Sequence, residues 1–252
     1  MLPVLLTCVP GAVRVSPKGH TMASRMSLQF PPPTVMAFVD AGYLTTGART
    51  HLKLPSAPRI DGDKLTFWAE NAWTSRRGGD LLRTYVYDAQ YPRDAAEYPG
   101  QRAYFDALAA QPGIRLRLGH LVERSAGSPR SRWEQKGVDT VLVLDLVRLA
   151  QQRAFDTALI IAGDRDLAEA FRVVADDYAR RVILYSVEGS APAKELVHSA
   201  DDHGIIGDPR LGMLVGLPVA RDSDATPVGT PGVHPAGDQQ GMAGEGETPR
   251  QP

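Results

Sequence analysis

Apolar and polar residues alternate along this chain in a way that predicts a sheet covered by helices. Short apolar runs bounded by turn residues are typical of buried strands, and apolar residues at three- and four-residue spacing are typical of helices that face a core. The predicted strands are Val35–Asp40, Leu81–Asp88, Ile114–Val122, Thr157–Ala162 and Arg181–Ser186. The predicted helices are Asp61–Thr74, Arg102–Ala110, Val138–Gln152, Leu167–Tyr178 and Ala191–Ser199. This order predicts an α/β fold, a three-layer α/β/α sandwich with a central parallel sheet.

The two ends of the chain lack this pattern. Residues 1–33 show no periodicity and end in three consecutive prolines, and the stretch from about Pro218 is rich in Pro, Gly and Asp with few large apolar side chains. Such segments bury too little surface to offset the entropy of ordering. We therefore expect a folded domain over residues 34–212, with disordered segments at 1–33 and 213–252.

The first residues do not predict a signal peptide. Met1 to Val15 is mildly apolar, but no basic residue precedes the apolar stretch and Pro3 and Pro10 interrupt it. We expect either a disordered extension or a mis-assigned start, with Met22, Met26 and Met36 as the candidate translation starts.

Composition narrows the functional classes. The chain has 252 residues, a net charge of −1 and a single cysteine, Cys8, which excludes an internal disulfide framework and a cysteine-based zinc site. No apolar run approaches the roughly 20 residues that span a bilayer. We expect a cytoplasmic protein without membrane contact, and only local charge can indicate a nucleic-acid partner.

Four aspartates fall where strands end or helices begin. Asp40 ends the first strand, Asp164 and Asp166 follow the apolar run Ala158–Ile161, and Asp139 opens the helix that follows Gly137. The carboxyl ends of parallel strands meet at one edge of a sheet, where ligands bind in open α/β folds. Clustered carboxylates repel one another unless a cation neutralises them, and oxygen-only clusters suit Mg²⁺ or Mn²⁺. The sequence therefore predicts a metal site at this edge.

Each of these acids also has a structural alternative. Asp40 could form an Asx turn with the two residues that follow it, Asp166 could be the N-cap of the next helix, and Asp139 could offset the helix dipole. With Asp166 as the cap, Asp164 is the hardest of the four to explain by structure alone.

Two further side chains accompany this set. Asp145 lies within the apolar stripe of its helix, where a buried carboxylate needs a partner, so we expect a structural ion pair or hydrogen bond rather than metal contact. Lys136 lies three residues before Asp139 and either orients an acid, contacts phosphate or is a solvated surface lysine.

A basic stretch precedes the same helix. Residues 115–136 contain five arginines and one lysine against two glutamates, with an aromatic side chain among them. Basic residues with an interleaved aromatic suit single-stranded nucleic acid, and a solvated loop is the alternative. The candidate RNA-binding residues are Arg130, Arg132, Trp133 and Lys136, with Arg76 and Arg77 as a second, weaker basic group.

Three motifs in order resemble the NYN (LabA-like) branch of the PIN-like ribonucleases. They are Phe38-Val39-Asp40-Ala41-Gly42-Tyr43-Leu44, then Lys136-Gly137-Val138-Asp139 running into Leu144-Asp145-Leu146, then Ile161-Ala162-Gly163-Asp164-Arg165-Asp166-Leu167. The resemblance covers about 34–207, including the distal Ser199-Ala200-Asp201. It implies a PIN-like, Rossmannoid sandwich whose acidic pocket binds one or two Mg²⁺ or Mn²⁺ ions. By this likeness Asp40, Asp139, Asp164 and Asp166 are the metal-site acids. The first motif departs from the Asp-Gly-x-Asn of many relatives, because Tyr43 replaces Asn.

The resemblance implies a metal-dependent endoribonuclease that hydrolyses phosphodiester bonds in single-stranded RNA. A second hypothesis is a non-catalytic regulatory module of the same fold, which binds RNA or a protein partner or forms a homo-oligomer. A third is a phosphohydrolase or phospho-acceptor domain of similar topology. The haloacid-dehalogenase type needs Asp-x-Asp after the first strand, and Ala41-Gly42 does not supply the second acid.

Overall fold

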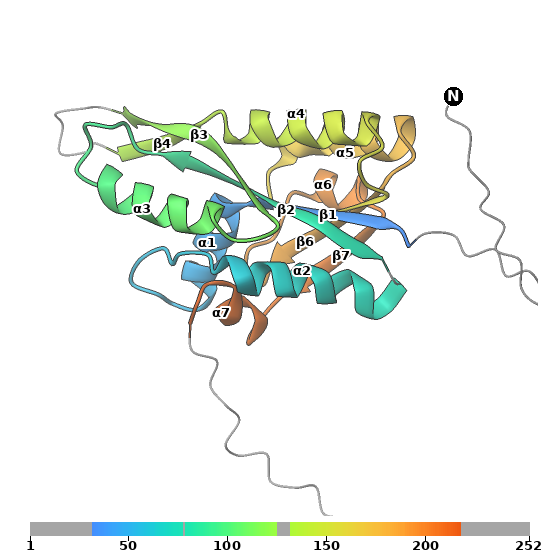
Figure 1. Cartoon of the computed structure of the whole chain (residues 1–252), viewed down its shortest axis with the longest axis horizontal. Coiled ribbons are helices and arrows are strands. Elements are labelled where there is room, and N and C mark those ends of the chain that lie inside the picture. Colours follow the sequence, from blue (N-terminus) through green and yellow to red (C-terminus); the bar gives the residue numbers. More distant parts are fainter. Residues whose placement is uncertain (1–31, 78, 125–131, 218–252) are drawn as a thin grey trace, which may run out of the picture. The chain divides into compact units, whose positions relative to one another are not determined.

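The computed structural model describes residues 32–217, except residue 78 and residues 125–131, and leaves the side chains of residues 73–77 and 132 undescribed. Within these residues, seven strands form one sheet with helices on both faces (Figure 1). This confirms the predicted α/β/α architecture. The terminal segments expected to be disordered lie almost entirely outside the described residues.

The sheet has the strand order β4-β3-β2-β1-β5-β6-β7. Its strands are β1 (Thr34–Asp40), β2 (Asp80–Gln90), β3 (Ile114–Arg124), β4 (Arg132–Lys136), β5 (Thr157–Ile161), β6 (Arg181–Val187) and β7 (Asp202–Ile206). All neighbouring strands are parallel except β3 and β4, which form an antiparallel pair at one edge. From β1 the chain first builds outward through β2 and β3, and later returns to the other side of β1 with β5.

Seven α-helices are described. They are α1 (Ala41–His51), α2 (Gly62–Arg77), α3 (Tyr98–Ala109), α4 (Val138–Gln151), α5 (Ala168–Arg172), α6 (Lys194–His198) and α7 (Arg210–Leu214). A 3-10 helix, η1 (Arg165–Leu167), and a π-helical segment, η2 (Val173–Asp177), flank α5. The single helix predicted over Leu167–Tyr178 is therefore a succession of 3-10, α and π segments. None of the described helices has the length and apolarity that crossing a bilayer requires.

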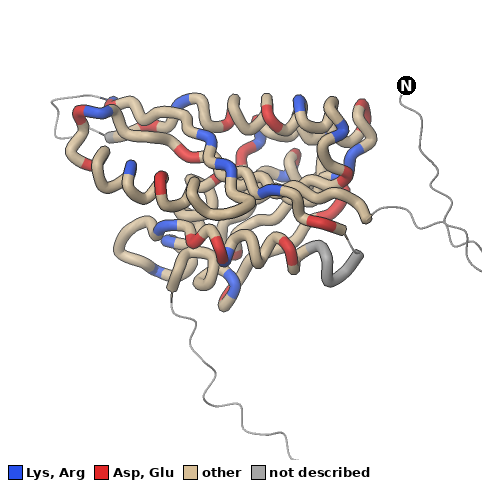
Figure 2. Tube along the Cα trace, viewed as in Figure 1, with Lys and Arg blue, Asp and Glu red and all other residues tan. Residues whose placement is uncertain are grey.

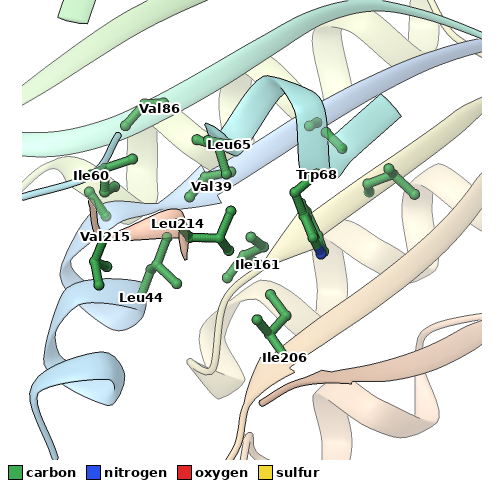
Figure 3. Packing of buried hydrophobic residues seen from close by; sticks show 14 of the residues in the cluster. Val39, Leu44, Ile60, Leu65, Trp68, Val86, Ile161, Ile206, Leu214 and Val215 are labelled. Atoms are coloured by element: carbon green, nitrogen blue, oxygen red, sulfur yellow. The ribbon is translucent and has the colours of Figure 1, made fainter. Parts of the chain in front are cut away.

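The strand alternation of β1 explains the two-sided core. Val35, Ala37 and Val39 contact the cluster formed with α1, α2 and α7, whereas Met36 and Phe38 contact the cluster formed with α4, α5 and α6. Successive side chains of a strand point to opposite faces of the sheet, so a continuous apolar run is buried on both sides. Figure 3 shows the first cluster, with side chains of α1 and α2 packed onto the sheet.

Three elements extend the fold beyond the prediction. α1 follows β1 directly, β7 adds the last parallel strand, and α7 ends with Leu214 buried. Val215 is buried as well, so the packed chain continues past residue 212, the predicted boundary. β4 also corrects the prediction, because Arg132–Lys136 is a strand rather than the end of a basic loop.

Candidate functional site

The predicted acids meet at the carboxyl edge of the sheet, near β1. At β1 the order in which the chain adds strands changes from one side of the sheet to the other. β1 has β2 on one side and β5 on the other, and Val39 is in register with Ile161. Asp40 is the next residue of β1, and Asp164 follows β5 after two residues. A crevice outside the strand ends at such a switch point is where open α/β sheets bind ligands.

Asp40 is fixed by a helix cap and is nearly inaccessible. Its side chain is the N-cap of α1 and accepts a hydrogen bond from the Tyr43 N–H at 3.0 Å, so the structural alternative for this residue is present in the fold. Only 8% of the residue is exposed. Burial, together with the charges of Asp139 and Asp88, raises the pKa of Asp40 to about 6. The cap therefore holds a carboxylate whose ionised form is disfavoured by burial and, to a smaller extent, by neighbouring charges.

Asp164, not Asp166, is the helix cap of the third motif. Asp164 precedes η1, and its Oδ1 accepts a hydrogen bond from the Asp166 N–H at 3.0 Å. The capping role predicted for Asp166 is therefore wrong, because the chain turns into η1 two residues earlier than the sequence indicated. Both carboxylates are exposed to solvent at the sheet edge.

Tyr43 and Gly163 hold this turn against α1. A Cβ atom at Gly163 would lie 2.2 Å from the Tyr43 ring, so only glycine allows the close approach. The Tyr43 hydroxyl donates to the Ser190 carbonyl at 2.6 Å. The first motif is thereby packed directly against the third, and Asp40 and Asp164 are carried on neighbouring, rigidly joined segments.

Asp139 connects the acids electrostatically. It lies in the first turn of α4, which starts after Gly137 in the left-handed conformation, with φ of 79°. Partial desolvation, followed by the charges of Asp164 and Asp166, raises the pKa of Asp139. Asp139 also raises the pKa of Asp40, so the charge of Asp139 couples to Asp40 on one side and to Asp164 and Asp166 on the other.

Asp88 is an acid at the same edge that the prediction omitted. It lies at the carboxyl end of β2, one residue beyond Tyr87, the residue in register with Asp40. Burial raises the pKa of Asp88 to about 6, and its Oδ1 accepts a hydrogen bond from the Ala89 N–H at 2.7 Å. The sequence could have identified Asp88 as a site residue, because Asp88 ends a predicted strand just as Asp40 does.

The chemistry of these donors fits a small divalent cation. All are carboxylate oxygens, the ligands that Mg²⁺ and Mn²⁺ prefer, and their mutual repulsion is what a cation would relieve. In the described part of the chain, no three Asp, Glu, His or Cys side chains are already gathered closely enough to form a complete metal site. The acids are thus neighbours at one edge without forming a ready-made coordination cage.

Asp145 has the structural partners that its burial requires. It is 7% exposed, and its two oxygens accept hydrogen bonds from Arg117 Nε at 2.9 Å and Arg148 Nη2 at 2.8 Å. The Tyr87 hydroxyl donates to the same carboxylate at 3.4 Å. Asp145 therefore ties α4 to β3 and β2 beneath the acidic edge.

The basic stretch is largely neutralised where its side chains are described. Glu134 pairs with Arg124 and, at 2.6 Å, with Lys136 Nζ, and Arg117 is paired with Asp145. Trp133 is half-buried and packs edge-on against Tyr91, with ring centroids 5.1 Å apart.

The surroundings of Trp133 are acidic rather than basic. It lines a pocket of about 440 Å³ together with Asp94, Glu97 and Glu123. Figure 2 shows basic and acidic residues interspersed along the described chain. Among the other predicted RNA-binding residues, Arg130 lies outside the described residues, and the side chains of Arg132, Arg76 and Arg77 are not described.

Comparisons with known proteins find a matching family model, one curated relative and a similar solved structure. The sequence matches the model of the NYN domain over residues 34–206. It is 35% identical over 81 residues to the uncharacterized protein y4oD of Sinorhizobium fredii, a match that covers 32% of this chain and about a third, 34%, of that relative. A crystal structure of a protein of unknown function from Vibrio parahaemolyticus superposes with a TM-score of 0.47 at 16% identity, over 70% of this chain and 94% of that one.

The family match extends from the first residue of β1 to the last residue of β7, and so includes all four predicted acids. The chain belongs to the NYN domain family of the PIN-like superfamily.

Proposed function

We propose that this NYN domain is a metal-dependent endoribonuclease that hydrolyses RNA phosphodiester bonds at the acidic edge of its sheet. The NYN domain has a PIN-like nuclease fold. The observation that best supports the proposal is the coupling of the acids, in which Asp139 raises the pKa of Asp40 while Asp164 and Asp166 raise that of Asp139. Crowded carboxylates disfavour the ionised form of the folded protein unless a cation neutralises them, which is the reason to expect a cation at this edge.

Asp40, Asp139, Asp164 and Asp166 would hold Mg²⁺ or Mn²⁺. A bound divalent ion supplies Lewis acidity toward a phosphate oxygen and lowers the pKa of a coordinated water. Asp40 anchors the site, because its cap and its burial fix the position of its carboxylate. Asp139 and Asp164 are open to solvent, so either can orient the attacking water and accept its proton.

A non-catalytic module that binds RNA or a protein partner is the second candidate. One observation favours it: the acids that the structure describes are not gathered into a complete coordination site. In this case the acidic edge would bind its partner without turnover.

Cleavage of a labelled single-stranded RNA in Mn²⁺ separates the two candidates. The wild type should cut the RNA, and Asp40→Asn or Asp164→Asn should reduce the rate by at least about 100-fold, since each removes a charged oxygen ligand. Asp80→Asn is the matched control, because Asp80 is an exposed acid at the opposite end of β2. Full activity of Asp164→Asn would contradict the proposal, and RNA binding by a wild type that never cleaves would favour the module.

A further inference from the structure

The edge strand β4 brings a side-chain amide to the acidic site. A Cβ atom at Gly42 would lie 3.0 Å from Gln135 Nε2, 3.1 Å from Gln135 Oε1 and 3.3 Å from Asp40 Oδ1. The amide of Gln135 and the carboxylate of Asp40 therefore border the same small space, which exists because residue 42 has no side chain. Two segments about ninety residues apart in the sequence meet there.

Gln135 is free to bind a ligand. The residue is exposed, and its side chain makes no hydrogen bond with any other residue that the structure describes. Its position is nevertheless set by the sheet, since Gln135 is in register with Leu121 of β3. Trp133 lies two residues earlier and points to the same face of β4, so an aromatic side chain flanks the amide.

Other polar side chains nearby are engaged elsewhere. The Tyr43 hydroxyl donates to the Ser190 carbonyl and accepts from the Val187 N–H, which directs it away from Asp40. Lys136 is the next residue of β4, but it points to the opposite face and pairs with Glu134 at 2.6 Å. Gln135 is thus a neutral donor placed beside a carboxylate whose neighbours are themselves acidic.

We propose that Gln135 is a substrate-positioning residue that donates a hydrogen bond from its amide to a phosphate oxygen of RNA bound at Asp40. This proposal rests on the proposed function, because it takes the substrate of that site to be a phosphodiester. A carboxylate cluster repels a phosphate, and an N–H donor beside it attracts the phosphate without forming an ion pair with the acids. The amide therefore contributes to holding the phosphate at the edge where Asp40 lies.

Kinetics of three single variants test the role of the amide. Gln135→Ala should lower kcat/KM by about 100-fold, the effect of losing one preorganised donor. Gln135→Glu has the same shape without the N–H donors and should not restore activity. Gln151→Ala is the control, since it makes the same change at the far end of α4. Wild-type kcat/KM in Gln135→Ala would overturn the assignment and leave the nuclease proposal intact.

Gly42→Ala provides an independent route to the same effect. The new Cβ atom would press most closely on the Gln135 amide and less closely on Asp40 Oδ1, 3.3 Å away, and a displacement of a few tenths of an ångström should lower kcat/KM by roughly three- to tenfold. Alanine is a better helix former than glycine, so α1 should not be weakened and the loss cannot be attributed to unfolding. In the double variant Gly42→Ala/Gln135→Ala the loss should equal that of Gln135→Ala alone. If the losses of the two single variants added up in the double variant, Gly42→Ala would not act through the Gln135 amide, and the expected coupling would be contradicted.

Side-chain amide NMR distinguishes failure of this assignment from failure of the nuclease proposal. The Gln135 NH₂ signals are identified by their disappearance in Gln135→Ala and followed while single-stranded oligoribonucleotide is added in Mg²⁺. They should shift in the wild type. A shift without any cleavage would refute the nuclease function and keep Gln135 as a phosphate-binding residue. Unchanged signals at saturating RNA would overturn the role of Gln135, whether or not the RNA is cut.

Discussion

At the scale of single residues, two opposing influences act on the ionisation of Asp40. It caps a helix, which favours the ionised carboxylate, yet it is buried beside other acids, which favours the protonated one. The second influence is stronger, because the pKa rises to about 6 from an ordinary value of 3.8. The folded protein therefore binds a proton at Asp40 more tightly than the unfolded chain does.

This shift predicts how Asp40→Asn changes stability. Between about pH 4 and 6 the folded state holds more protons than the unfolded state, so wild-type stability falls as pH rises through this window and stays lower above it. Asparagine keeps an N-cap without the charge. In EDTA at pH 8, Asp40→Asn should raise the free energy of unfolding by about 1–3 kcal/mol, and the gain should vanish near pH 3.5. Urea unfolding at both pH values checks this, with Asp80→Asn as control; no gain at pH 8 would contradict it.

Asp145 shows the opposite relation between an acid and the fold. Its partners Arg117 and Arg148 are 42% and 51% exposed, so both can turn to water when the carboxylate is removed, while the buried Tyr87 hydroxyl loses an acceptor. Asp145→Ala should therefore destabilise the fold by about 1–3 kcal/mol, less than for a fully buried pair. Asp139→Ala removes a repelled charge and should not lower the melting temperature. Thermal melts of both variants measure these changes in stability. An Asp145→Ala protein that is fully stable but inactive would contradict the structural role and would indicate that Asp145 is a ligand of the metal.

At the scale of elements, the sequence indicated the strands and helices with strong apolar patterns and missed those without. β1, β5 and α4 were predicted to within one residue at each end, because their apolar runs are long or regular. α1 was missed because Thr45, Thr46 and Gly47 are poor helix formers, and tertiary packing of Leu44 and Ala48 overrides that preference. β4 was missed because it is entirely polar apart from Trp133.

We expect the β3–β4 hairpin to be the element that contacts single-stranded RNA. Replacing Arg130 and Arg132 by Ala should weaken single-stranded RNA binding and flatten its salt dependence, because fewer phosphates are neutralised. Trp133→Ala should weaken binding by about 1–3 kcal/mol at an unchanged salt slope if a base stacks on the ring. Fluorescence anisotropy at several salt concentrations measures both, with Arg49→Ala at the far end of α1 as control. Unchanged affinity in all variants would mean that RNA approaches the acids from another side.

At the scale of the whole molecule, the strand order determines the site. Acids that are more than a hundred residues apart in the sequence, Asp40 and Asp164, become neighbours because β5 pairs with β1. Because both acids follow apolar runs that predict strands, the sequence was sufficient to indicate that they lie at the carboxyl edge of the sheet. The sequence could not show that Asp164 rather than Asp166 caps η1, or that Gln135 reaches Asp40, because both depend on side-chain packing between distant segments.

Metal binding to such a site should depend steeply on pH. A cation competes with the proton that Asp40 holds below about pH 6, so the apparent affinity for Mn²⁺ should fall by at least about tenfold per pH unit below that value. Above pH 7 it should be nearly constant. Calorimetric titrations at pH 5, 6 and 7 measure this, and equal affinity at pH 5 and 7 would be incompatible with a metal held by Asp40.

The most direct measurement is a crystal structure of the full chain soaked in Mn²⁺, with anomalous scattering used to locate the metal. We expect a manganese peak at the carboxyl edge of the sheet, with an Asp40 oxygen and oxygens of Asp139 or Asp164 at about 2 Å. This peak should be lost in Asp40→Asn. A saturating soak that leaves this edge without a peak, or a peak that persists in Asp40→Asn with no contact to Asp139 or Asp164, would contradict the proposed metal site.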